Sequence, residues 1–233
     1  WRSGSGSYVV GYRDFVAMVE VGGAARVLPK PPASIGQLLI SADGARTAAP
    51  LEDGRLSVFD LGAGSLLSTM VGSGGGEIYH AAFTPDGARI AVARDGGFSI
   101  HDAGGGALVC QAPDRVFNIA FVKDGGTLVT TMNGMHARHD AATCKQLGGG
   151  SSATGGTFGS TVSPDGELLA SAAGDGHDLE VMRSRDFKVL RPALAHAPEM
   201  LGMVDEIVAL ERRRFERAPV VVAVISRANG NPK

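Results

Sequence analysis

A four-residue turn that recurs at nearly constant spacing is the feature that most constrains the fold of this chain. All four copies end in Asp-Gly, and the Asp residues stand at positions 43, 86, 124 and 165, which are 43, 38 and 41 residues apart. Asp can bond the backbone ahead of it, and Gly takes the left-handed conformation that closes a bulged hairpin. Four such turns in phase predict a chain of repeated β-hairpins. The turns are Ser41–Gly44, Thr84–Gly87, Val122–Gly125 and Ser163–Gly166.

Short apolar strands are expected on both sides of each turn, because a hairpin needs two paired strands. The strands expected before the turns are Leu38–Ile40, Ala82–Phe83, Ile119–Phe121 and Ser160–Val162. Those expected after the turns are Arg46–Ala49, Arg89–Ala93, Thr127–Thr131 and Leu168–Ala172.

A second marker recurs in the same phase. Fifteen or sixteen residues after each of the first three turn Asp residues, an aromatic-like residue precedes an Asp. Val19-Glu20 lies forty residues ahead of the first such pair, and Met182-Arg183 occupies nearly the same slot in the fourth repeat. A small loop and a further strand are expected after each pair. The three pairs are Phe59-Asp60, His101-Asp102 and His139-Asp140.

The two markers together resemble the WD-repeat family, in which Trp-Asp ends the third strand of each repeat. The resemblance implies an all-β fold: a β-propeller of four-stranded antiparallel blades, WD-type, that is incomplete or part of a seven-bladed ring. No Trp-Asp pair is present, and the Gly-His pair that opens a typical repeat survives only as Ala195-His196. The His–Ser–Asp–Trp network of well-formed repeats is therefore expected to be missing, which leaves apolar packing and strand ladders to hold the blades.

The markers divide residues 1–233 as one propeller domain. The predicted blades are about 35–77, 78–115, 116–155 and 156–195, with partial blades at 8–34 and 196–233. The two partial blades either complete one shared blade in a small ring or belong to a larger, seven-bladed ring. We favour the larger ring, because closure with five blades is less common among WD-type repeats. Trp1–Ser7 reads as a flexible leader or a cut edge, which would make the chain a fragment.

Composition excludes several classes of partner. A formal net charge of −2 gives no electrostatic case for binding nucleic acid or an anionic membrane. No apolar run approaches the roughly 18 residues of a membrane span. The longest run, Val220–Ile225, suits a buried strand. We therefore expect protein partners in a complex, and no nucleic acid, membrane span or small-molecule substrate.

The two cysteines, Cys110 and Cys144, lack the close spacing of a zinc or redox motif. Ordinary reduced thiols are the favoured interpretation, and a disulfide between neighbouring outer strands is the alternative. Reduced thiols would indicate a cytoplasmic protein.

No catalytic, cofactor-binding or metal-binding residues are predicted, so the chain is not expected to be an enzyme. His101 and His139 suggest a two-histidine metal site, but equivalent slots of neighbouring blades should lie too far apart to share an ion. His80 and His136 offer no third ligand at a characteristic spacing. The glycine-rich stretches 72–76 and 148–156 lack the Lys-Ser/Thr of a phosphate loop and are expected to connect blades.

The basic residues Arg212, Arg213, Arg214 and Arg217 form the one concentrated basic patch of the sequence. They are either a solvated segment or a contact for an anionic partner, and we take them as a speculative partner-binding site. The predicted function is a non-catalytic protein-interaction scaffold, a subunit of a larger assembly.

The alternative is a propeller-type guanine-nucleotide exchange factor for a small GTPase. It is based on a likeness to the WD protein of the endoplasmic reticulum that activates the Sar GTPase. The likeness covers Val162–Gly166, Ala195-His196 and Val222–Ser226, with Gly4–Gly11 as a relic of a glycine-rich loop.

Overall fold

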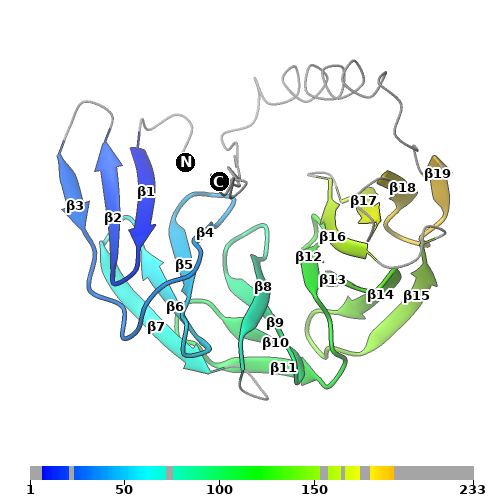
Figure 1. The fold of residues 1–233 in the computed structure, drawn as a ribbon, viewed down its shortest axis with the longest axis horizontal. Coiled ribbons are helices and arrows are strands. Elements are labelled where there is room, and N and C mark those ends of the chain that lie inside the picture. The colour runs from blue at the N-terminus through cyan, green and yellow to red at the C-terminus, as the bar shows by residue number, and fades with distance from the viewer. Residues whose placement is uncertain are drawn as a thin grey trace, which may run out of the picture.

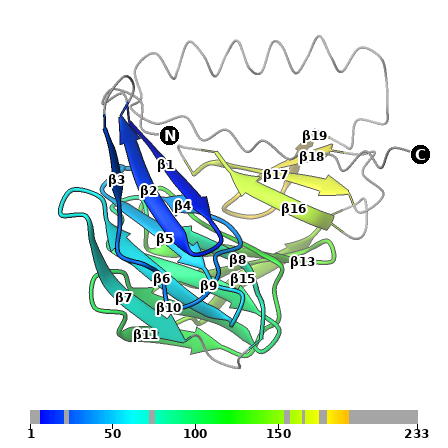
Figure 2. The ribbon, with the colours of Figure 1, turned by 60° about the vertical axis from the view of Figure 1, so that its left-hand side comes forward.

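The fold, taken from a computed structural model, consists of antiparallel sheets that follow one another around an arc (Figure 1). The structure describes residues 7–20, 24–71, 76–152, 157–163, 166–173 and 179–191. Within these residues there are five sheets, and in each the strands lie side by side in chain order. We call the sheets blades 1 to 5. Ribbons seen from a second side show the blades as separate, tilted layers (Figure 2).

Blade 1 has three described strands, and the other four blades have four each. Blade 1 contains β1 (Ser7–Tyr12), β2 (Phe15–Glu20) and β3 (Ala25–Val27), and blade 2 contains β4 (Leu39–Ile40), β5 (Arg46–Pro50), β6 (Arg55–Asp60) and β7 (Ser65–Val71). Blade 3 contains β8 (Ile78–Phe83), β9 (Arg89–Arg94), β10 (Gly97–Asp102) and β11 (Leu108–Ala112). Blade 4 contains β12 (Asn118–Phe121), β13 (Thr127–Met132), β14 (Met135–Asp140) and β15 (Gln146–Ser151). Blade 5 contains β16 (Thr157–Val162), β17 (Leu168–Ala173), β18 (Leu179–Arg183) and β19 (Val189–Arg191).

The predicted Asp-Gly hairpins are confirmed. Gly44, Gly87, Gly125 and Gly166 all have positive φ, between 67° and 78°. In the first three turns the Asp carboxylate accepts a hydrogen bond from the backbone N–H two residues later, at 2.8–3.0 Å. Asp165 lies outside the described residues. The local chemistry of this turn therefore places the first two strands of every four-stranded blade.

The second marker is confirmed as the end of the third strand of each blade. Strands β6, β10, β14 and β18 end on the second residue of the marker pair. The first residue of each pair is buried: Phe59, His101, His139 and Met182 are at most 3% exposed. These side chains pack between neighbouring blades. The His139 ring meets the Phe98 ring of blade 3 edge-on, with centroids 4.8 Å apart.

Polar networks inside the blades are more complete than the sequence predicted. The ring of His101 bonds through Nδ1 to the carbonyl of Gly106 and through Nε2 to the hydroxyl of Ser99, 2.9 Å away. His139 repeats the arrangement with the carbonyl of Cys144 and the hydroxyl of Thr130. Because Nδ1–H donates to a carbonyl, Nε2 of a neutral ring must accept from the hydroxyl. Both histidines thus fill the slot of the missing tryptophan with satisfied polar atoms.

A recurrent contact, which we call the rim contact, joins the outer strand of one blade to the turn between the third and fourth strands of the next. At the first three interfaces the contacting residue is paired, across the outer two strands of its blade, with the residue just before the marker pair. Register therefore aims three chemically different side chains at the same turn of the following blade. In chain order they are Arg26, which donates to the carbonyls of Gly62 and Ala63, Ser68, which donates to that of Ala103, and Cys110.

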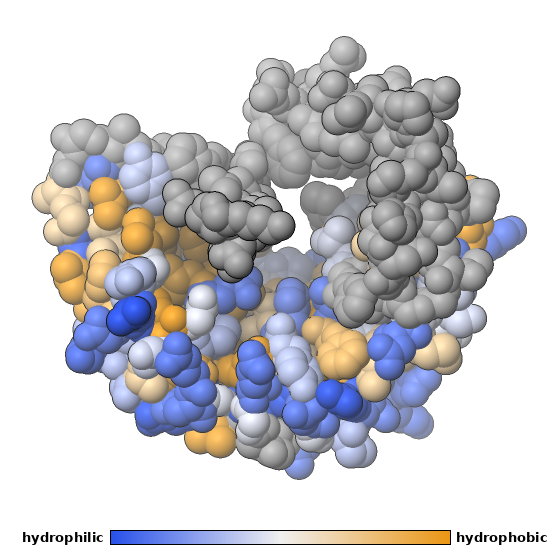
Figure 3. Space-filling view, viewed as in Figure 1, coloured by the Kyte–Doolittle hydropathy of each residue, from blue (hydrophilic) through white to orange (hydrophobic). Residues whose placement is uncertain are grey.

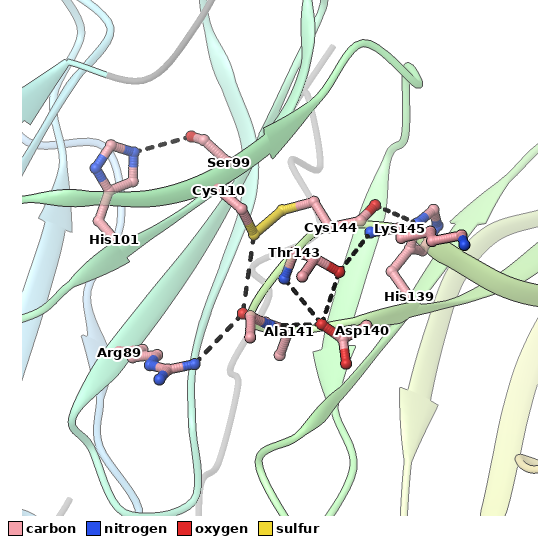
Figure 4. Close-up of a disulfide and its surroundings, with 11 residues drawn as sticks. Arg89, Ser99, His101, Cys110, His139, Asp140, Ala141, Thr143, Cys144 and Lys145 are labelled. Atoms are coloured by element: carbon pink, nitrogen blue, oxygen red, sulfur yellow. Dashed lines mark hydrogen bonds between the residues drawn. A yellow bond between two sulfur atoms is a disulfide. The ribbon is translucent and has the colours of Figure 1, made fainter.

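At the third interface the rim contact is a disulfide, and the prediction of reduced thiols is wrong. Cys110 of β11 is bonded to Cys144 of blade 4, with Cα atoms 5.6 Å apart (Figure 4). The alternative of two outer strands is close but not correct, because Cys144 lies in the turn before β15 rather than in that strand. The sequence could not reveal the pair, since the two cysteines become neighbours only when the blades stack.

The fourth interface uses the cross-strand neighbour instead. Gly148 occupies the contact position and has no side chain, and its partner in β14, Arg138, donates to the carbonyl of Arg185 at 2.7 Å. Next to it Gly150 makes room for Phe187, because an added Cβ would lie 2.7 Å from that residue's Cβ. Gly148 to Gly150 therefore belong to strand β15, which corrects their assignment to a connection between blades. A strand built of glycines lets the next blade approach closely.

One buried cation has no counterion among the described residues. The side chain of Arg94, at the end of β9, is 1% exposed, and its Nη1 donates to the carbonyl of Gly76 at 3.3 Å. Its Nε and Nη2 have no hydrogen-bond partner. Burial lowers the pKa of Arg94. The interface between blades 2 and 3 is therefore not purely apolar near the end of β9, although apolar side chains such as Leu56 and Val92 fill the rest of it.

Candidate interaction site

The antiparallel strand order gives each blade two distinct ends. The end that we call the turn face carries the Asp-Gly turns and the turns of the rim contacts. The opposite end, the linker face, carries the connections between blades and the turns between second and third strands. The side chains that lie at the linker face between blades 2 and 4 form the candidate site.

An arginine that lies against two aromatic rings is at the centre of this site. The guanidinium carbon of Arg115 is 5.8 Å from the ring centroid of Tyr79 and 5.1 Å from that of Phe117. The two rings meet edge-on at 5.4 Å. Asp95, in the turn after β9, forms an ion pair with Arg115 at 2.8 Å and accepts a hydrogen bond from the Tyr79 hydroxyl. We call these four residues the arginine cluster.

The arginine cluster is preorganised and accessible. The side chain of Arg115 is 47% exposed and that of Asp95 is 60% exposed, while both rings are half-buried. The hydrogen bond with Tyr79 raises the pKa of Arg115, so the guanidinium stays charged. Tyr and Arg are the residue types that most often dominate binding at protein interfaces, partly because few rotamers are lost on binding.

Two hollows flank the arginine cluster. The acidic hollow, about 330 Å³, lies between blades 2 and 3 and includes Glu52, Glu77, Tyr79 and His80 in its wall. The second, which we call the apolar hollow, is about 530 Å³ and lies beside blade 4. Its wall includes the apolar side chains of Val116, Met132, Met135 and Ala137, together with polar ones such as Asp114, Arg115 and Gln146. Met135 is 60% exposed.

Charge is uneven between the two hollows. Within the described residues, Glu52 and Glu77 form no ion pair. The nearest arginines in the sequence do not neutralise them, because Arg55 is paired with Asp53 at 2.6 Å and Arg115 is paired with Asp95. Burial lowers the pKa of His80, and its bond to the Ile119 backbone opposes that effect. His80 is therefore neutral near pH 7, and the wall of the acidic hollow carries negative charge without a matching cation.

The described part of the face seen in Figure 3 is mainly polar. Blue residues cover most of the described surface in Figure 3, and orange ones gather at the left, over blade 1. The exposed large apolar side chains of blade 1 are Val10, Tyr12, Phe15 and Val27.

The site residues predicted from the sequence lie elsewhere. Arg212, Arg213, Arg214 and Arg217 fall outside the described residues. His101 and His139 lie in different blades, each bonded to a hydroxyl of its own blade. The described part of the chain holds no group of three or more metal-ligating side chains, and no helix in it is long and apolar enough to span a membrane.

Sequence reasoning missed Tyr79, Arg115 and Phe117. A signal was present, because aromatic residues are scarce in the chain and two of them fall at the beginning of first strands in successive repeats. Both residues lie at the linker ends of their blades and stay half-buried, and their rings meet across the interface of blades 3 and 4.

Solved structures share this architecture, and 1493 of their chains match it. One match is a chain in a crystal structure of the mitotic checkpoint complex, with a TM-score of 0.66 and 16% sequence identity. The alignment covers 78% of this chain and 59% of that one, so this chain spans less than two thirds of its length. The fold is a WD-repeat-like β-propeller.

The predicted fold class of this propeller is confirmed: it is all-β, and its complete blades are four-stranded and antiparallel. Identity of 16% supports the fold alone. No family profile and no curated protein matches the sequence. The number of blades in the ring and the single-domain assignment stay predictions, and the partial blade at 196–233 lies outside the described residues.

Proposed function

We propose that this propeller is a non-catalytic protein-interaction scaffold that binds a protein partner through its linker face. The arginine cluster carries the proposal, because it presents an arginine, a tyrosine and a phenylalanine in a fixed arrangement between two hollows. Partly exposed side chains of these types concentrate binding energy when a partner covers them. The similar solved chain comes from a complex, which agrees with a role for this propeller as an assembly subunit.

A catalytic role has less support. Among the described residues, the histidines of the repeat are occupied with structural hydrogen bonds, and the carboxylates of the Asp-Gly turns hold their own backbone. The exchange-factor alternative stays a prediction, because Ala195-His196 and Val222–Ser226 lie outside the described residues. The cytoplasmic location was inferred from reduced thiols and loses that support, since stable disulfides are typical of oxidising compartments.

The test immobilises four forms of the full chain and compares the proteins that each form captures from native cell extract. A Tyr79→Ala/Arg115→Ala variant should lose about tenfold or more of a partner captured by the parent chain, since hot-spot truncation costs about 2 kcal/mol or more. Charge reversal at Arg212, Arg213 and Arg214 should weaken capture in a salt-dependent way if that segment lies at the rim of the interface.

Lys123→Glu is the matched control, because this exposed lysine lies beyond the other end of β12, on the turn face. It should leave capture unchanged. All variants should melt within a few degrees of the parent. Equal capture by the Tyr79→Ala/Arg115→Ala variant and the parent would remove the linker face from the interface, and turnover of a nucleotide or metabolite by the purified chain would refute the scaffold.

A further inference from the structure

The chemistry of the two hollows indicates what kind of segment the linker face accepts. Glu52 and Glu77 line the acidic hollow, and none of the described lysines or arginines contributes to its wall. Two exposed carboxylates favour a ligand that brings positive charge and hydrogen-bond donors.

The apolar hollow has the opposite character. Met132, Met135, Val116 and Ala137 contribute apolar surface to its wall, which holds one carboxylate, Asp114, and one arginine, Arg115, that is paired with Asp95. Methionine side chains are flexible and polarisable, so they adapt to apolar groups of different shapes. This hollow therefore suits an aliphatic or aromatic side chain.

The two hollows adjoin across a single pair of residues. Tyr79 lines the acidic hollow and Arg115 lines the apolar one, and the Arg115 Nη2 lies 3.2 Å from the Tyr79 hydroxyl oxygen. A few residues of extended chain, at roughly 3.3 Å each, are enough to pass over this pair of side chains from one hollow to the other. One short segment can thus fill both hollows while its backbone crosses the arginine cluster.

We propose that the linker face binds an extended peptide segment of a protein partner, with a lysine or arginine in the acidic hollow and a large apolar side chain in the apolar hollow. The inference rests on the proposed function, since it specifies the partner of the same face. The partner is recognised by its charge and by the order of two side chains, not by a folded surface.

The test uses random peptides displayed on phage and selected on the immobilised full chain. Enriched peptides should carry Lys or Arg within a few positions of a large apolar residue. Synthetic, fluorescently labelled copies are then titrated with the parent chain and its variants. Glu52→Gln/Glu77→Gln should weaken binding at least about tenfold, and added salt should weaken it for the parent more than for this variant.

Two further variants assign the remaining contacts. Met135→Ser should weaken the same peptides severalfold without changing the salt dependence. Glu167→Gln, a change of carboxylate next to Gly166 on the turn face, is the control and should leave affinity unchanged. Circular dichroism and melting curves establish that each variant is folded.

Enrichment of acidic peptides, no enrichment at all, or equal affinity of the Glu52→Gln/Glu77→Gln variant and the parent would overturn the inference. These outcomes are separable from failure of the proposed function. If Tyr79→Ala/Arg115→Ala abolishes capture of the native partner while the library yields no basic peptides, the scaffold stands and its partner has another chemistry. If basic, apolar peptides bind the hollows but native capture ignores the cluster, the linker face is not the main interface.

Discussion

At the residue scale, single positions in the left-handed region determine how each blade begins and how it meets its neighbour. In the Asp-Gly turns the residue in this region is glycine. In the turns of the rim contacts it is Gly64 in blade 2 and Gly106 in blade 3. Cys144 and Phe187 occupy the same turn position with φ of 56° and 54°. Such a conformation costs a side chain free energy. Both residues make a contact with the preceding blade that a glycine cannot make, and these contacts offset that cost.

Replacement of a turn glycine should be costly. Gly87→Val or Gly166→Val should each lower the free energy of unfolding by about 1–3 kcal/mol, because a β-branched residue resists positive φ. At Gly166 a Cβ would also lie 2.7 Å from Val122. Urea denaturation measures the loss. Gly148→Val is the control, since a Cβ there meets nothing within 4 Å. Equal stability of all three variants would refute the role assigned to the turns.

At the element scale, the rim contact is a repeated joint whose chemistry changes from blade to blade. The strand register supplies the position, and the side chain there supplies a guanidinium, a hydroxyl or a disulfide sulfur. The surroundings of the disulfide show how closely this joint is built. The Cys110 sulfur also approaches the Ala141 carbonyl, and Arg89 of β9 donates to the same carbonyl at 3.4 Å (Figure 4).

The disulfide should be the strongest of the rim contacts. It closes a loop with a sequence separation of 34, for which chain entropy predicts stabilisation of up to about 3–4 kcal/mol. Cys110→Ser/Cys144→Ser should lower the melting temperature, and a reductant should do the same to the parent. Ser68→Ala, at the equivalent position in blade 2, should cost about 1 kcal/mol or less.

Mass spectrometry gives the direct check: the native protein should gain two hydrogens on reduction, since one disulfide becomes two thiols. No mass gain, or a melting temperature of the parent that does not change when reductant is added, would contradict the disulfide between the blades.

At the scale of the whole molecule, buried histidines link stability to pH. His80, His101, His136 and His139 have lowered pKa values, each chiefly through desolvation by burial. Below the ordinary histidine pKa of about 6.5 the unfolded chain binds protons that the folded chain does not. Unfolding then becomes easier as the pH falls, by at most about 1.4 kcal/mol per pH unit for each histidine. About one pH unit above 6.5 all four are almost fully neutral in both states, so this dependence fades there.

Urea midpoints of the parent should therefore fall between pH 7.5 and 5.5. His101→Phe/His139→Phe should reduce that fall, because the equivalent slot of blade 2 already holds Phe59 and phenylalanine takes up no proton. The variant loses two hydroxyl bonds, so its absolute stability is not the readout. An identical pH dependence in parent and variant would place the acid sensitivity elsewhere.

Much of the fold was predictable, because the features that encode it are local. The Asp-Gly turns, the paired strands and the buried slot at the end of each third strand follow from residues close together in sequence. The candidate site was not predictable in the same way. Arg115 and Phe117 are 36 and 38 residues from Tyr79, and only the stacking of blade 4 on blade 3 makes them neighbours.

The sequence alone determined the repeat, its period and its strand order, since a turn selects its conformation from a few adjacent side chains and the spacing of the turns sets the length of each blade. The tertiary structure decided which side chains of successive blades meet. It joined Cys110 to Cys144, set the ring of His139 against that of Phe98, and assembled the arginine cluster between two hollows. Such contacts depend on how one sheet packs against the next, and that geometry leaves no pattern within a single repeat.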